Sequence, residues 1–140
     1  MESNAKWESF QSQNEILYRL HFESQVGYTF QWTNLSSVFE EKLETTKVRE
    51  KWKLMNKAVE IDDVDEIVIT IQNGLNNACD IKQDNSSGTL DISFKDDALD
   101  ILLKWQFDCK LDPFGIEDLL KDTLLTCNYL MEEQVYYFDY

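Results

Sequence analysis

Few residues in this sequence have the type and spacing that catalysis or metal binding requires. His21 is the single histidine, and it lies between Leu20 and Phe22 with no second ligand or nucleophile near it in the chain. Because a catalytic base needs an oriented partner, a surface histidine is the simpler interpretation. The sequence contains no glycine-rich phosphate loop and no HExxH, GxSxG or CxxC motif. We therefore expect a protein that is not an enzyme and that uses no cofactor or metal.

Carboxylates cluster at two places in the chain. Residues 62–66 contain four acids and could attract a cation, but they lack the alternating oxygen ligands and the turn glycine of a calcium loop. Acids in front of an apolar run suit the positive end of a helix dipole, so we interpret this cluster as a solvated helix cap. The acids of residues 96–100 indicate a solvated loop or the rim of a partner contact.

The overall charge is strongly negative, with 27 acidic against 13 basic residues and a formal net charge of -14. Affinity for nucleic acid depends on Lys and Arg neutralising phosphates, so DNA contact is expected only indirectly or through a basic tail missing from these residues. Cys79, Cys109 and Cys127 have no metal-binding spacing and cannot all pair, which indicates reduced thiols in an intracellular protein. Neither a signal peptide nor an apolar run of membrane-spanning length is present, so we expect no membrane contact.

The clearest structural pattern lies in the last third of the chain. Leu103, Trp105, Phe107 and Cys109 alternate with polar residues, which predicts a half-buried strand that ends at Asp112-Pro113. Beyond the proline, apolar residues recur at spacings of about three and four, as in a helix that packs along a seam. The predicted seam, with one residue of a second apolar row, consists of Ile116, Leu120, Cys127, Leu130 and Met131.

Strands and helices are also predicted earlier in the chain. Residues 15–22 and 28–34 alternate around a turn at 25–27 and predict a hairpin. We then expect one helix over 34–43, capped by Asn34 or Ser36, and a second one, capped by Thr45 or Thr46. The second helix would carry its apolar residues at helical spacing: Val48, Trp52, Met55 and Val59.

The middle of the chain predicts a further helix and a second hairpin. Residues 62–74 favour a helix ending at Asn-Gly, although their β-branched run would also serve a strand. Residues 79–82 and 89–94 predict two strands around a polar tip. This order predicts an α+β fold, with an antiparallel sheet curled around a helical insert at about 34–75. The predicted domains are 1–112, and 113–140 as a helix packing on the first.

Three stretches of the chain together resemble a known family. They are Trp7 followed by ILYRLHF, a Gly-Tyr hairpin leading through TNLSSVFEEKL, and KWQFDCKLDPFGIEDLLKDTLLTCNYLMEEQ. In order and spacing they are similar to the head domain of the Cernunnos/XLF family of non-homologous end-joining factors, including its yeast members. The resemblance covers Trp7 to about Glu133.

The resemblance implies a fold and a function. The fold is a seven-stranded antiparallel β-sandwich head with a helix-turn-helix insert, followed by the start of a coiled-coil stalk through which two copies dimerise. The function is that of a nuclear, non-catalytic scaffold in double-strand break repair. Such a scaffold bridges DNA ends with the Ku heterodimer and stimulates the DNA ligase IV complex through the ligase IV scaffold, a head-and-stalk paralogue.

The resemblance also implies two partner contacts. A leucine in the loop before the tryptophan strand falls at Ile101, next to Leu99 and Leu102. The end of the helical insert supplies Met55, Lys57, Ala58 and Val59, where Ala58 stands at a position that can be basic in the family. From the residues alone, a core residue at the start of a strand is the simpler interpretation of Ile101, and the inner face of a helix is the simpler one of residues 55–59; with the resemblance, the two interpretations of Ile101 are about equal.

Two other interpretations stay open from the sequence. One is the head domain of a related sandwich-plus-coiled-coil scaffold, either the ligase IV scaffold itself or a centriole-assembly protein. The other is an unassigned interaction module with more helix than predicted here. The sequence stops where a stalk would lengthen and carries no basic tail, so we expect a head domain or truncated form whose stalk dimer is weak.

Overall fold

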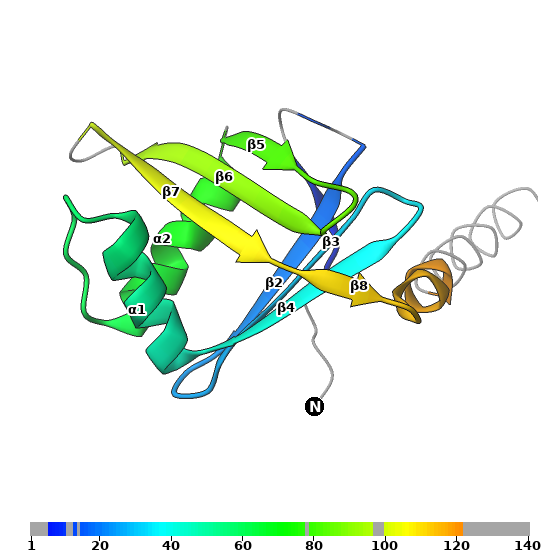
Figure 1. Ribbon diagram of the computed structural model, residues 1–140, viewed down its shortest axis with the longest axis horizontal. Coiled ribbons are helices and arrows are strands. Elements are labelled where there is room, and N and C mark those ends of the chain that lie inside the picture. Colours follow the sequence, from blue (N-terminus) through cyan, green and yellow to red (C-terminus); the bar gives the residue numbers. More distant parts are fainter. Residues whose placement is uncertain (1–5, 11–12, 14, 78, 97–99, 122–140) are drawn as a thin grey trace, which may run out of the picture.

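The computed structural model describes residues 6–10, 13, 15–77, 79–96 and 100–121 (Figure 1). Its strands form two antiparallel sheets, which together with the helices confirm the predicted α+β class. The first sheet has the order β1-β2-β3-β4-β8 and contains Glu8–Ser9, Leu17–Glu23, Gly27–Thr33, Val38–Glu44 and Lys110–Asp112. The second has the order β5-β6-β7 and contains Asp80–Gln83, Thr89–Asp96 and Ile101–Asp108.

The first predicted hairpin is confirmed as β2 and β3. Its strands pair from Leu17 opposite Thr33 to Glu23 opposite Gly27, so the alternating apolar side chains of both strands lie on one face. Gly27 has a φ of +145°, and a Cβ there would collide with the backbone carbonyl of Leu43 on β4. Glycine at this turn is therefore what allows β3 to pair with both neighbours.

The helix predicted over 34–43 is wrong, because residues 38–44 form strand β4 beside β3. The Asn34 side chain does cap, but it caps a turn: its Oδ1 accepts hydrogen bonds of 2.9 Å from the backbone N–H groups of Ser36 and Ser37. Alternate residues of β4 then face the core, and one of them is the acid Glu41. A charged residue at an inward position hid the strand period and left a spacing that resembled a helix.

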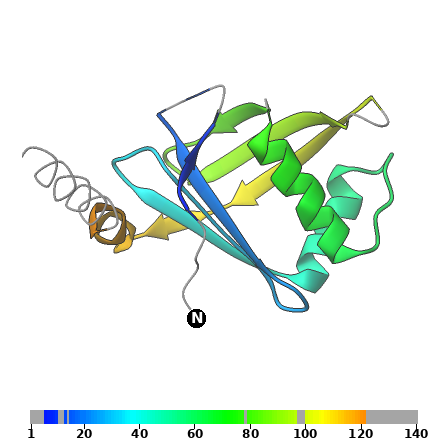
Figure 2. The same ribbon diagram turned by 180° about the vertical axis from the view of Figure 1, so that it is seen from behind.

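The helical insert consists of two helices, α1 (Thr45–Met55) and α2 (Val64–Asn76), and thus begins eleven residues later than predicted. The N-cap of α1 is Glu44 and makes no side-chain capping bond, so the predicted threonine cap is wrong. Asp63 caps α2 by accepting from the N–H of Asp65, which confirms the acidic cluster as a helix cap. The two helices lie together at one end of the sheets (Figure 2).

The core lies between the two sheets and the helical insert. Trp32, Trp52 and Trp105 are fully buried. The rings of Phe30 on β3 and Phe107 on β7 stack with centroids 3.6 Å apart, which ties one sheet directly to the other. The predicted alternation of β7 is therefore confirmed, and β7 continues past Cys109 into β8, so a single run of chain crosses from one sheet to the other (Figure 1).

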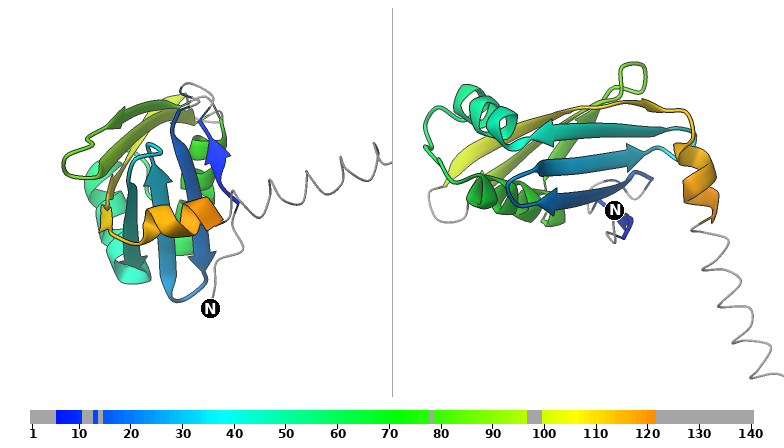
Figure 3. Two further views of the ribbon diagram at one scale, coloured as in Figure 1. Left: turned by 90° about the vertical axis from the view of Figure 1, so that its right-hand side faces the viewer. Right: turned by 90° about the horizontal axis from the view of Figure 1, so that it is seen from below.

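A third helical segment begins directly after the predicted strand end. Residues 115–121 are helical and lie at the opposite end of the sheets from α1 and α2 (Figure 3). Gly115 approaches β4 so closely that a Cβ would lie 2.5 Å from Cβ of Val38. This segment therefore begins against the end of β4, and its residue Leu119 is buried. No helix in the described part of the chain is long and apolar enough to cross a membrane.

Candidate partner-binding surface

The structure brings the two predicted partner contacts to the same end of the molecule. Ile101 is the first residue of β7, where its half-buried side chain packs against the core. The next residue, Leu102, points to the outside and is 52% exposed. Leu99 lies outside the described residues. Ile101 thus packs against the core while the neighbouring leucine faces solvent, and its contact with a partner stays a prediction.

Charged residues close the β6–β7 hairpin around this leucine. Asp96 pairs with Ile101 in the register of the two strands, and the N–H of Asp100 donates to the carbonyl of Asp96 at 2.8 Å. Asp100 has a φ of 53°, in the left-handed region that aspartate tolerates better than most residues. Its carboxylate lies 3.6 Å from Nζ of Lys95. Apolar Leu102 therefore has both an acid and a base beside it.

The end of α1 supplies the second contact. Met55 and Val59 are half-buried and pack against the core, whereas Lys57 and Ala58 are exposed. The indole N–H of Trp52 donates to the carbonyl of Val59 at 2.9 Å, which fixes the chain just after the helix. Of the four predicted interface residues in this stretch, two are therefore held against the core and the other two are exposed to a partner.

Asn56 joins the end of α1 to β7, and sequence reasoning missed it. Its Nδ2 donates to the carbonyl of Lys104 at 2.8 Å, and its Oδ1 accepts from the N–H of the same residue at 2.9 Å. The side chain is buried, so these two bonds are not shared with solvent. An asparagine after a helix ordinarily signals only a C-cap, and nothing in the sequence indicates a contact 48 residues away.

A buried charge network holds α1 to both sheets further along the helix. Glu41 on β4 is 7% exposed and accepts hydrogen bonds from the Tyr28 hydroxyl and, at 2.9 Å, from the N–H of Asp108. Nζ of Lys51 on α1 lies 3.7 Å from the Glu41 carboxylate and 4.9 Å from the centre of the Trp105 ring. Burial, and then the charge of Glu41, raise the pKa of Tyr28 well above its usual value, which keeps the hydroxyl protonated as a donor.

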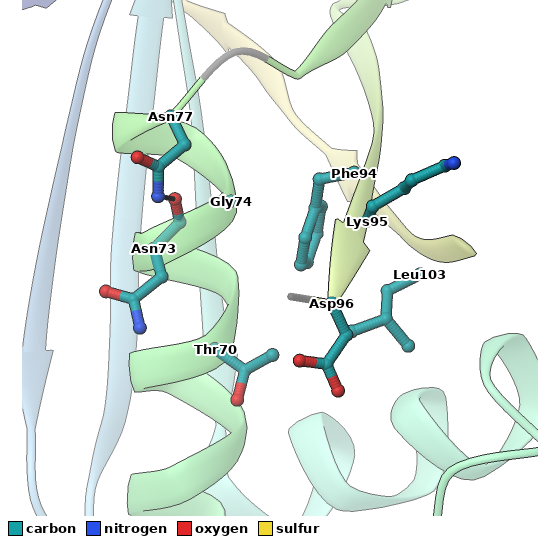
Figure 4. Close-up of a pocket in the computed structure, with 8 residues that line it drawn as sticks. All are labelled: Thr70, Asn73, Gly74, Asn77, Phe94, Lys95, Asp96 and Leu103. Atoms are coloured by element: carbon teal, nitrogen blue, oxygen red, sulfur yellow. Dashed lines mark hydrogen bonds between the residues drawn. The ribbon is translucent and has the colours of Figure 1, made fainter. Parts of the chain in front are cut away.

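Shallow depressions flank this surface. One of about 350 Å³ lies beside the end of α1, and its lining is Lys53, Asn56, Lys57, Val59, Glu60, Ile61 and Asp62. Another of about 380 Å³ lies between α2 and the β6–β7 hairpin (Figure 4). Its lining is Phe94 and Leu103 together with polar Thr70, Asn73, Gly74, Asn77, Lys95 and Asp96. In the described part of the chain, no three His, Cys, Asp or Glu side chains lie where they could hold a metal ion.

The described part of the predicted dimerisation seam lies at the other end of the molecule. Ile116 is half-buried and Leu120 is 54% exposed, whereas Leu119 is buried. The remaining seam residues, Cys127, Leu130 and Met131, lie outside the described residues. The described helix thus presents Leu120 to solvent and buries Leu119.

Two antiparallel sheets, a helix pair inserted at one end and a helix beginning at the other define a head domain that offers surfaces rather than an enclosed site. The chain matches the XLF N-terminal domain over residues 6–111, and it belongs to the XLF family. None of the curated proteins compared with it matches. XLF proteins are non-catalytic structural factors of non-homologous end joining, so the chain has a role in that repair process.

Proposed function

We propose that this domain is the head of a nuclear scaffold that binds the DNA ligase IV scaffold paralogue through the start of β7 and the end of α1. In this role it helps the Ku heterodimer hold broken DNA ends for the ligase IV complex. The observation that carries the proposal is exposed Leu102, placed beside half-buried Ile101 at the tip of a charged hairpin.

The physical chemistry of this surface suits a modest contact. Burying an aliphatic side chain such as that of Leu102 contributes about 1.5 to 3 kcal/mol. The charges of Lys95 and Asp100 beside it would set orientation and association rate more than affinity. Contacts of this strength become effective when they are repeated, as between scaffolds that are themselves dimers.

The opposite end of the head leaves room for a second assembly step. We propose that the helix beginning at Gly115 carries a homodimer seam through Leu120, away from the surface at Leu102. DNA would be held by the partners or by a basic tail, because a net charge of -14 opposes contact between this domain and phosphates.

The experiment is a calorimetric titration of the domain with the purified ligase IV scaffold. We expect Leu102→Asp to weaken binding at least tenfold, because the aspartate places a second acid in an apolar contact. Leu111→Asp is the matched control: Leu111 is 59% exposed on β8, at the other end of the molecule. Ile101→Asp is less specific, since Ile101 also packs against the core.

The proposal has two ways to fail in this experiment. If the unmodified domain does not bind the ligase IV scaffold, the partner is wrong. If it binds and Leu102→Asp binds equally well, the partner is right and the surface is wrong. A parallel titration with the Ku heterodimer tests whether the head or another part of the protein meets Ku.

A further inference from the structure

The outer edge of β7 is occupied by side chains where another strand could pair. In an antiparallel ladder, alternate residues turn their N–H and C=O groups to opposite edges, and β6 takes one edge of β7. On the other edge, Asn56 meets both backbone groups of Lys104, and Nζ of Lys51 donates to the carbonyl of Gln106. Glu41 meets the N–H of the next residue in this series, Asp108.

Helix α1 and its C-cap Asn56 therefore take the place of an edge strand beside β7. Of these hydrogen bonds to β7, those of Asn56 lie nearest to the tip of the β6–β7 hairpin. One carboxamide supplies both the donor and the acceptor that a neighbouring strand would supply, at 2.8 and 2.9 Å. Asn56 is 6% exposed, so water does not compete for these bonds. The next residue in the same alternation is Leu102, at the centre of the proposed partner contact.

We infer that Asn56 is a positioning residue for partner binding: it fixes residues 57–59 relative to the start of β7, so that both contacts meet the partner as one rigid surface. Asn56 lies between the two contacts, directly before Lys57 and two residues along the β7 edge from Leu102. Its side chain is only 6% exposed and bonds to Lys104 through both Nδ2 and Oδ1, so it offers a partner little surface of its own. The inference takes the identity of the partner from the proposed function. The geometry around Asn56 does not depend on that function.

A positioning role has a kinetic signature that a contact residue lacks. Without Asn56, only part of the population holds both contacts in the binding arrangement, and the apparent affinity falls by that fraction. Since molecules in the wrong arrangement do not associate productively, the loss appears in the association rate. Removal of a contacting side chain such as Leu102 instead shortens the life of the complex, which raises the dissociation rate.

The test compares the rate constants of three variants for the ligase IV scaffold by surface plasmon resonance. We expect Asn56→Ala to lower the association rate constant by about tenfold and to leave the dissociation rate constant within about twofold. Leu102→Ala should show the opposite pattern. Asn34→Ala is the control, because the Asn34 side chain caps the turn between β3 and β4, away from both proposed contacts; we expect unchanged rates.

A second readout needs no partner. The Lys104 amide hydrogen should exchange with solvent faster in Asn56→Ala than in the unmodified domain, by at least tenfold, and its exchange should not change in Asn34→Ala. If Asn56→Ala does not fold, Asn56→Ser takes its place, because its hydroxyl can still meet one of the two Lys104 groups and buries no charge. We expect a smaller fall in association rate for that variant.

Each failure has a distinct meaning. An unmodified domain that does not bind the scaffold overturns the proposed function, while the exchange of the Lys104 amide still decides whether Asn56 locks α1 to β7. Wild-type rate constants in Asn56→Ala, together with faster exchange at Lys104, would overturn the positioning role. So would a rise in the dissociation rate alone, which would make Asn56 a contact residue.

Discussion

At the scale of single residues, polar side chains within the core decide how the helical insert is attached. Glu41 has its carboxylate satisfied by Tyr28, Asp108 and Lys51 together. A buried ion with several partners is tolerated, but removal of one partner leaves an uncompensated charge. Residues that read as surface charges in the sequence are therefore part of the joint between α1 and the two sheets.

We predict that Lys51→Met destabilises the domain by about 3 kcal/mol, because Glu41 would lose its counter-ion while remaining buried. Methionine keeps most of the apolar stem, so the loss reports the charge rather than the packing. Urea unfolding followed by tryptophan fluorescence measures the change. Lys53→Met is the control two residues along α1, where the side chain is 61% exposed, and we expect it to change stability by less than about 0.5 kcal/mol. Equal effects at both positions would contradict the buried network.

At the scale of elements, the sequence predicts best where one period persists. The alternation of β7, the hairpin of β2 and β3, and the acidic cap of α2 are all present as predicted. The error at β4 has a physical cause, since its inward positions include Glu41, whose partners come from distant strands and from α1. A buried acid whose hydrogen-bond partners lie far away in the chain leaves no local pattern in the sequence.

The candidate site was predictable to the same extent. Ile101 and residues 55–59 were placed by resemblance to a family, and the structure brings them to one end of the molecule. That Leu102 faces outward follows from the alternation of β7, but its degree of exposure depends on what covers the strand. The role of Asn56 could not be predicted. In the sequence it looks like an ordinary residue at a helix end, and nothing marks its pairing with the edge of a strand 48 positions away.

The helix that begins at Gly115 gives an element-scale prediction. We expect Gly115→Ala to destabilise the domain by about 1 to 3 kcal/mol, because its Cβ would lie 2.5 Å from Cβ of Val38 and push the helix away from β4. Glu117→Ala, at an exposed position of the same helix, controls for helix propensity and should be near neutral. Thermal unfolding followed by circular dichroism measures both. An unchanged midpoint in Gly115→Ala would show that this helix does not depend on close contact with β4.

At the scale of the whole molecule, the two ends of the head differ in what they present. One end carries the helical insert and the tip of the β6–β7 hairpin, and the other carries the helix that begins at Gly115 (Figure 3). Partner binding at the first end and dimerisation at the second would not compete for the same surface. A scaffold built in this way could join the two interactions into chains, which suits the family's role in non-homologous end joining.

The most direct test of this account is a hydrogen-exchange footprint of the domain with and without the purified ligase IV scaffold. We predict slower exchange in residues 55–59 and 100–104 upon binding, and no change in β8 or at Leu120. Leu102→Asp should remove the footprint without altering exchange in the core strands. Protection confined to β8 and the helix at 115–121, with residues 55–59 and 100–104 unchanged, would contradict the proposed surface and move the partner contact to the other end of the head.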